Sequence, residues 1–150
     1  MTITVNDLMR KKLITVGESA SVQQAAKKMK DKNVSSLVVV DENSSPIGLV
    51  TERDLVRKVC IQDAYPSKIT AREIMSSPLI TIESRSSPSE ALDIMLQNNV
   101  RHLFVVDNNK LPEQKNKLIG VVTPLDFTRS EGYSGSDNNE TIEMLLEYYI

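Results

Sequence analysis

A Thr-x-x-Asp pattern occurs twice in the sequence, each time directly after an apolar stretch, as Thr51 with Asp54 and as Thr123 with Asp126. A carboxylate can accept hydrogen bonds from two neighbouring sugar hydroxyls. A Thr hydroxyl beside the N–H groups of a helix start suits sugar or phosphate oxygens. The same pattern is also typical of a helix N-cap with an acidic residue in the first turn, which is worth about 1 kcal/mol. Ligand contact and helix capping are therefore both open interpretations.

A pair of basic residues, Arg101 and His102, precedes an apolar run and could contact phosphate. Arg presents a planar fork of donors, and His can add positive charge. The alternative is an exposed Arg beside a His whose hydrogen bonds are satisfied at the edge of the core. Ser35 and Ser36 stand at the corresponding place earlier in the chain, so we expect two unequal sites. Lysines in the polar loop at 108–117 could add charge, although a solvated loop is the favoured interpretation.

Composition and charge restrict the class of protein. The chain has 150 residues, of which 40% are hydrophobic and 25% charged, as in ordinary globular proteins. The net charge of −2 argues against nucleic acid as a partner, and no apolar run approaches the ~20 residues of a membrane helix. One Cys and one His cannot build a structural zinc site alone, and free Cys is typical of a reducing cytoplasm. Without a Gly-rich dinucleotide loop, a P-loop or a metal-ligand cluster, we expect no enzyme, no catalytic residue and no metal.

Local patterns predict the elements that must position these residues. Ser21 and Gln24 form a capping-box pattern before apolar residues at i, i+3, i+4 and i+7, which indicates an amphipathic helix. The apolar runs at 37–40 and 47–50, with a turn between them, predict a hairpin. The other elements expected in the first half are a lead-in turn at 3–9, a strand at 13–16, and a helix from Thr51 to about Cys60 with Leu55, Val56 and Val59 as its apolar face.

The pattern then repeats. Residues 5–41 align with residues 71–107 at a shift of 66, and thirteen of the 37 aligned positions are identical. Beyond residue 107 the shift becomes 72, because six residues are inserted in the polar stretch 108–117. The second helix start again carries a capping box, now with Pro at the first helical position. These observations indicate a tandem duplication.

Each repeat is expected to run β-α-β-β-α. A helix between the first two strands favours a parallel pair with a right-handed crossover, and a short turn makes the second and third strands a hairpin. Because a unit of about 60 residues is marginal alone, we expect two units packed face to face around a pseudo-twofold axis. We assign residues 1–62 to the first repeat, 63–70 to a linker and 71–130 to the second repeat. Residues 131–150 are predicted to form a mobile polar segment and a short amphipathic C-terminal helix, which would cover the module's own core or contact a partner.

The duplicated unit resembles a CBS domain pair, also called a Bateman module, over about residues 3–129. The resemblance lies in the helix with Ala and Met at core spacing, the Leu-x-Val-Val-Asp strand and the Gly-containing strand that ends in Thr-x-x-Asp. It implies an α/β (α+β) fold of two tandem CBS motifs. It also implies a cytoplasmic, non-catalytic sensor of energy state or metabolites that binds AMP, ADP or ATP, with S-adenosylmethionine less expected. A homodimer and an effector protein are the implied partners, and without an effector domain the chain resembles a stand-alone CBS protein. The alternative is a dimerisation or protein-interaction scaffold with vestigial nucleotide clefts.

The resemblance also assigns roles to individual residues. The two aspartates would hold ribose, and the two threonines of the pattern would lie near ribose or phosphate, with Arg53 beside them in the first repeat. A Thr at the end of each first strand would face adenine, and two aliphatic residues per repeat would flank the ring; all of these serve equally well as ordinary strand and core residues. The preferred site, in the second repeat, comprises Thr81, Val100, Arg101, His102, Val121, Thr123 and Asp126. The other site comprises Thr15, Val34, Ser35, Ser36, Leu49, Thr51, Arg53 and Asp54.

Overall fold

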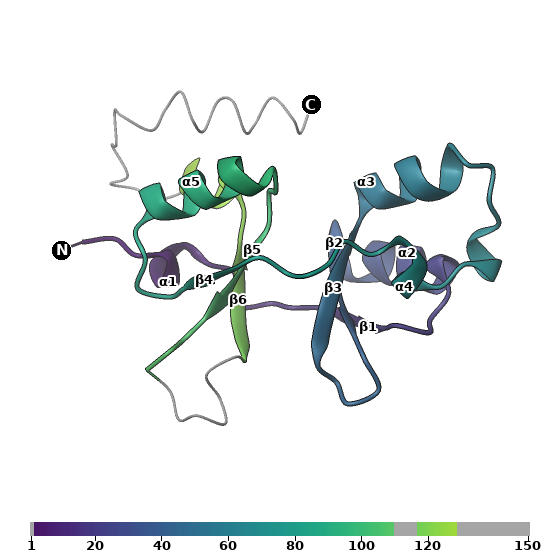
Figure 1. The fold of residues 1–150 in the computed structure, drawn as a ribbon, viewed down its shortest axis with the longest axis horizontal. Helices are drawn as coiled ribbons and strands as arrows, with labels where there is room; N and C mark the ends of the chain where they lie inside the picture. Colours follow the sequence, from purple (N-terminus) through teal and green to yellow (C-terminus); the bar gives the residue numbers. More distant parts are fainter. Residues whose placement is uncertain (1, 110–116, 129–150) are drawn as a thin grey trace. The chain divides into compact units, whose positions relative to one another are not determined.

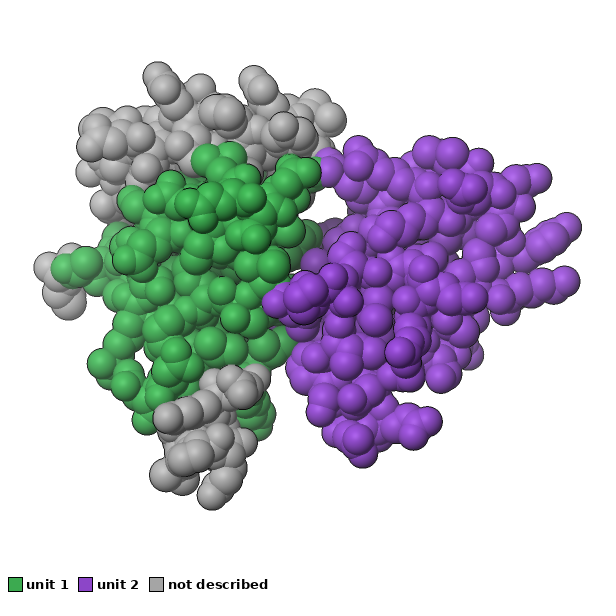
Figure 2. All heavy atoms as spheres, viewed as in Figure 1, with its two compact units in different colours: residues 1–12, 80–150 green, residues 13–79 purple. Residues whose placement is uncertain are grey.

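A computed structural model describes residues 2–109 and 117–128 of the chain (Figure 1). The chain divides into two compact units (Figure 2). Unit 1 combines residues 1–12 with residues 80–150, and unit 2 consists of residues 13–79. Each unit is built around its own three-stranded sheet.

Unit 2 contains the sheet of the first repeat, in the order β1-β2-β3. β1 pairs with β2 in parallel, and β2 pairs with β3 in antiparallel fashion, which confirms the predicted parallel pair and hairpin. The strands are β1 (Thr15–Gly17), β2 (Ser36–Val40) and β3 (Pro46–Thr51). The helical elements are α2 (Val22–Lys32), α3 (Glu52–Leu55), the π-helical turn η1 (Val56–Cys60), the 3₁₀ turn η2 (Pro66–Lys68) and α4 (Ala71–Ile74).

Unit 1 contains the sheet of the second repeat, in the order β4-β5-β6, with the same parallel and antiparallel pairings. Both sheets carry an irregularity in register near the turn of the hairpin, between Val39 and Val40 and between Val105 and Val106. The elements of unit 1 are α1 (Val5–Leu8), β4 (Thr81–Glu83), α5 (Pro88–Asn98), β5 (Leu103–Val106), β6 (Leu118–Val122) and α6 (Pro124–Thr128).

The short lead-in helices are exchanged between the repeats. α1 precedes the first repeat in the chain, but its Val5 N–H donates to the Ser86 carbonyl at 2.9 Å within unit 1. α4 precedes the second repeat, but its Ala71 N–H donates to the Ala20 carbonyl at 2.8 Å within unit 2. The compact units therefore differ from the repeats as these follow one another in the sequence, and each sheet receives its lead-in segment from the other repeat.

The long helices begin and end as local sequence dictates. Ser21 caps α2 and Ser87 caps α5, each within a full capping box, as predicted. Both helices end at an Asn in the left-handed conformation, Asn33 with φ of 53° and Asn99 with φ of 52°; Asn tolerates this region better than most residues.

Each unit has its own hydrophobic core beneath its sheet. The buried residues are aliphatic positions of the strands and the inward stripe of the long helix, as the helical spacing predicts. In unit 2 the cluster comprises Val16, Val22, Ala25, Met29, Leu37, Val39, Val50, Val59, Ala71 and Ile74. In unit 1 it comprises Val5, Ile82, Ala91, Leu92, Met95, Leu103, Val105, Val122 and Phe127. Because α1 and α4 each supply residues to these clusters, the exchanged segments form part of the core.

The helix expected from Thr51 to Cys60 changes character halfway. α3 ends at Leu55, and η1 continues as a π-helical turn. A wider turn no longer follows the 3.6-residue period on which the predicted apolar face rested. Val59 is buried, but Val56 is 54% exposed, so placing Val56 on the core face was wrong. The predicted C-terminal helix and the polar segment before it lie outside the described residues.

Candidate functional site

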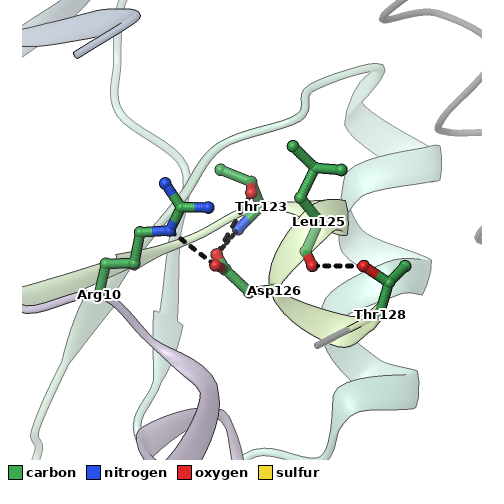
Figure 3. Close-up of polar contacts among 5 residues, drawn as sticks. All are labelled: Arg10, Thr123, Leu125, Asp126 and Thr128. Carbon is green, nitrogen blue, oxygen red and sulfur yellow. Dashed lines mark hydrogen bonds and ion pairs between the residues drawn. The ribbon is translucent and has the colours of Figure 1, made fainter. Parts of the chain in front are cut away.

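Asp126, in the second Thr-x-x-Asp pattern, lies at the centre of a polar cluster at the start of α6 (Figure 3). The Thr123 N–H donates to Asp126 Oδ2 at 2.8 Å, and the Thr123 hydroxyl lies 3.2 Å from the same oxygen. Arg10 Nε donates to the other oxygen, Oδ1, at 2.8 Å. Asp126 is only 5% exposed. Since burial of an unpaired carboxylate is costly, Arg10 supplies the positive charge that this aspartate requires.

The first Thr-x-x-Asp pattern forms the same turn with a different cation. The Thr51 N–H donates to Asp54 Oδ2 at 2.9 Å, and the Asp54 N–H donates to the Thr51 hydroxyl at 3.2 Å. Lys58 Nζ lies 3.2 Å from Asp54 Oδ1, and it also donates to the Ile74 carbonyl at 2.8 Å. Both aspartates thus close a helix-start turn, and both take part in an ion pair. The capping role expected from the sequence is confirmed for Thr51, which forms a full capping box with Asp54.

Backbone pairing with β6 positions Arg10. The Arg10 N–H donates to the Val121 carbonyl and the Val121 N–H donates to the Arg10 carbonyl, both at 2.9 Å. Gly120 makes this approach feasible, because an added Cβ there would lie 2.6 Å from Met9 Sδ and 2.9 Å from the Arg10 carbonyl oxygen. The chain therefore needs glycine before Val121 so that the segment carrying Arg10 can lie against the strand.

Unit 2 repeats this arrangement with a neutral residue in place of Arg10. Ser76 exchanges backbone hydrogen bonds of 2.9 and 2.8 Å with Leu49. At Gly48 an added Cβ would lie 2.5 Å from Met75 Sδ and 2.9 Å from the Ser76 carbonyl oxygen. The shift of 66 aligns Arg10 with Ser76, so the scaffold is duplicated whereas the charge is not.

The sheet topology of unit 1 gathers most other residues of the preferred site at one end. Thr81 begins β4 and pairs with Phe104 near the start of β5. Arg101 and His102 immediately precede β5, and Thr123 immediately follows β6, which runs in the opposite direction. The start of β4, the start of β5 and the end of β6 therefore meet at the same end of the sheet, where Arg10 and Asp126 also lie.

The residues predicted for the first-repeat site have an equivalent placement in unit 2. Ser36 lies directly opposite Thr51 across the hairpin, and the Glu52 N–H donates to the Ser35 carbonyl at 3.0 Å. Arg53 is half-buried in α3.

Thr15 and Thr81 begin their strands rather than end them, because the ladders start one or two residues later than the apolar runs indicate. Thr15 and Thr81 are exposed, in keeping with positions at the end of a sheet.

The four aliphatic residues predicted to flank a ring are all half-buried. Val34 and Val100 pack against the core clusters of their units, while Leu49 and Val121 lie in β3 and β6. Partial burial leaves each of them some accessible surface without removing it from the packing of its unit. This placement suits both the ligand-contact and the core interpretation.

Sequence reasoning missed the two cations that pair with the aspartates. Arg10 is 116 positions from Asp126, and no local spacing joins them. Lys58 stands four residues after Asp54, a spacing that favours an ion pair on a helix, so this partner could have been found.

No helix within residues 2–109 and 117–128 has the length and apolar character that crossing a bilayer requires. The same residues hold no group of three or more His, Cys, Asp or Glu side chains placed to bind a metal ion.

Comparison with known proteins identifies the family. The model of the CBS domain matches residues 5–60 and again residues 71–132. An uncharacterised protein of Methanopyrus kandleri is 38% identical over 145 residues, which cover 97% of this chain and 71% of that protein. A conserved CBS domain protein of unknown function from Thermoplasma acidophilum has the same fold, with a TM-score of 0.81 at 23% identity over 99% of this chain and 77% of that one. A CBS domain pair solved in complex with 5′-methylthioadenosine and S-adenosyl-L-methionine is 28% identical, with a TM-score of 0.71 over 86% of this chain and 95% of that one. The chain belongs to the CBS domain family, as a tandem pair of CBS domains.

Proposed function

We propose that this CBS pair is a regulatory, non-catalytic module that binds an adenosine nucleotide, AMP, ADP or ATP, and so senses energy state or a metabolite. The observation that carries the proposal is the convergence of Thr81, Arg101, His102 and Thr123 at one end of the unit 1 sheet, beside the buried Asp126. Hydroxyls and a carboxylate suit a ribose, and Arg and His suit phosphate. The related CBS pair that holds two adenosine derivatives supports the same ligand class.

One feature favours a nucleotide with phosphate over S-adenosylmethionine. Arg101 and His102 precede β5 at the same end of the sheet as Asp126, and their positive charge suits phosphate better than the sulfonium cation of S-adenosylmethionine. Unit 2 has Ser35 and Ser36 at this place, with Arg53 near the turn and Lys58 paired with Asp54. We therefore assign the stronger phosphate binding to unit 1 and the weaker to unit 2.

Calorimetry with AMP, ADP, ATP, adenosine and S-adenosylmethionine tests the ligand class directly. A ligand at 100 times its Kd should also stabilise the fold by about 2.7 kcal/mol. Asp126→Asn and Asp54→Asn form a matched pair of variants, because Asn keeps an acceptor for the Thr backbone N–H of each turn. We expect Asp126→Asn to cost more affinity for AMP than Asp54→Asn. If no adenosine compound binds the wild-type protein, the proposed function is wrong.

The second candidate is a dimerisation or interaction scaffold whose clefts no longer bind nucleotide. It is favoured by one observation, that both aspartates already have an internal cation, Arg10 at 2.8 Å and Lys58 at 3.2 Å. A scaffold would show no nucleotide binding but would keep its oligomeric state and its protein partner.

For the nucleotide module we propose a homodimer that acts in the cytoplasm on an effector protein. Size-exclusion chromatography with light scattering would decide the oligomeric state. Related CBS-containing proteins do assemble, since a CBS-CP12 protein from cyanobacteria is hexameric. Monomeric behaviour at micromolar concentration would count against the dimer without affecting the ligand proposal.

A further inference from the structure

Arg10 is fixed at its backbone and half-exposed at its side chain. Two backbone hydrogen bonds of 2.9 Å hold it to Val121, and its side chain is 46% exposed while that of Asp126 is 4% exposed. Met9 and the Arg10 carbonyl also pack closely against Gly120. A change of rotamer is therefore the motion available to this guanidinium.

The contact with Asp126 uses only part of the guanidinium's capacity. Arg carries five N–H donors, and the bond of 2.8 Å to Asp126 Oδ1 uses Nε. Figure 3 shows the two terminal nitrogens beyond Nε, one of them directed toward the side of Thr123, and the printed bond to the carboxylate uses neither. The four N–H groups on those nitrogens form a planar fork, which matches the geometry of a phosphate group.

Asp126 can accept a further hydrogen bond at Oδ1, the carboxylate oxygen that faces Arg10. Oδ2 faces the N–H and hydroxyl of Thr123, whereas Oδ1 receives the bond from Arg10. A carboxylate oxygen can accept two hydrogen bonds, so a ligand hydroxyl at Oδ1 would either share that oxygen with Arg10 or displace it. In either case the positive charge of Arg10 remains within reach of the ligand, because its backbone is held to β6.

We propose that Arg10 is a specificity-determining residue of the unit 1 site. Without ligand it neutralises Asp126, and with ligand its terminal nitrogens contact an anionic group, so the site prefers a phosphorylated nucleoside to a neutral one. This inference rests on the function proposed above, and adds to it a residue from a segment that lies outside the second repeat in the sequence. Arg101 and His102 remain the other basic residues at that end of the sheet.

Unit 2 has no arginine at the position equivalent to Arg10. Ser76 takes the position of Arg10 beside β3, and the cation that pairs with Asp54 is Lys58, whose Nζ also binds the Ile74 carbonyl. A lysine held by two partners within its own unit acts as a structural bridge between α3 and α4. We therefore expect the preference for a phosphorylated over a neutral nucleoside to be stronger in unit 1 than in unit 2.

Calorimetric titration of the full chain with adenosine and with AMP tests the role of Arg10. The site to follow is the one that Asp126→Asn removes. Arg10→Met keeps an unbranched apolar stem but removes the charge, and Arg10→Lys keeps the charge without the fork. The matched control is Arg72→Met, which breaks an Arg–carboxylate contact of similar length, 2.9 Å to Glu18, at an exposed place in unit 2.

We expect Arg10→Met to lower the ratio of AMP affinity to adenosine affinity about tenfold or more, as loss of a charge-assisted contact implies. Adenosine affinity should stay equal or rise, Arg10→Lys should recover part of the ratio, and Arg72→Met should leave it unchanged. Retained adenosine binding also shows that the variant is folded. If both ligands bind and Arg10→Met has the wild-type ratio, the role of Arg10 is refuted while the proposed function stands. If neither ligand binds the wild-type protein, the proposed function and this inference both fail.

Discussion

Replacing Gly120 by Ala should loosen the segment that carries Arg10, and the structure allows the size of the effect to be worked out. The new Cβ would lie 2.6 Å from Met9 Sδ, 3.0 Å from Met9 Cγ and 2.9 Å from the Arg10 carbonyl oxygen. The thioether is flexible and can give way. The carbonyl cannot, because it accepts the Val121 N–H as half of the bridge that joins the segment to β6.

Three contributions set the magnitude of the change in unfolding free energy. Overpacking of a close contact costs about 1–3 kcal/mol, and weakening a backbone hydrogen bond costs about 1 kcal/mol. Ala in place of Gly in a strand gives back about 0.5–1 kcal/mol through chain entropy. The net expected loss is about 2 kcal/mol, which corresponds to a fall in Tm of about 4–8 °C for a chain of this size.

Urea and thermal denaturation measure this loss, and Gly17→Ala is the matched control. Gly17 also lies in a strand, but an added Cβ there meets nothing within 4 Å, so Gly17→Ala should be neutral or slightly stabilising. The double variant Met9→Ala with Gly120→Ala should show a favourable coupling energy, because it removes the sulfur contact but leaves the carbonyl contact. A Gly120→Ala protein that melts within about 1 °C of wild type, or a Gly17→Ala protein that loses as much stability, would refute the reasoning.

Three further changes have expected effects on stability that denaturation would measure. Arg10→Met should lower the unfolding free energy by about 1–2 kcal/mol because it leaves a buried carboxylate unpaired, whereas Arg72→Met should cost less than about 1 kcal/mol because its ion pair is exposed; equal losses would contradict the difference in burial. Asn33→Ala should cost about 1 kcal/mol and Asn33→Gly should not, since the residue has φ of 53° and Gly adopts this region freely; a reversed order would be contrary to the strain argument. Ser21→Ala should cost about 1 kcal/mol through loss of the cap on the Gln24 N–H, and an unchanged midpoint would mean that water replaces the cap.

Local features were predictable from the sequence because their causes lie within a few residues. The capping boxes at Ser21 and Ser87 depend on a spacing of three. The turn from Thr123 to Asp126 follows the same logic, with its hydrogen bonds closing over three positions. The parallel and antiparallel pairings also follow from connection length, since a helix separates the first two strands and a short turn the next two.

The features that escaped prediction depend on contacts between distant segments. Nothing near Arg10 in the sequence indicates that it pairs with β6 or with Asp126, because both contacts form only when the lead-in segment reaches the other repeat's sheet. The exchange of α1 and α4 has the same origin. Val56 failed for a different reason, since a π-helical turn changed the period on which the predicted core face rested.

The two copies of the candidate site keep a common scaffold but pair their aspartates with different cations. Each copy buries an aspartate at a helix start, so each requires a cation nearby. Unit 2 takes it from Lys58, four residues along and bound to a carbonyl of α4, whereas unit 1 takes it from Arg10 on a segment held to β6. The shift of 72 aligns Lys58 with Ser130. Neither repeat therefore carries the other repeat's cation at the aligned position. A lysine bound to two partners supports the fold, whereas a half-exposed guanidinium that uses only Nε for its aspartate has further donors for a ligand. Identity between the repeats therefore argues for a shared fold, and the residues at which they differ are the ones to vary when the sites are compared.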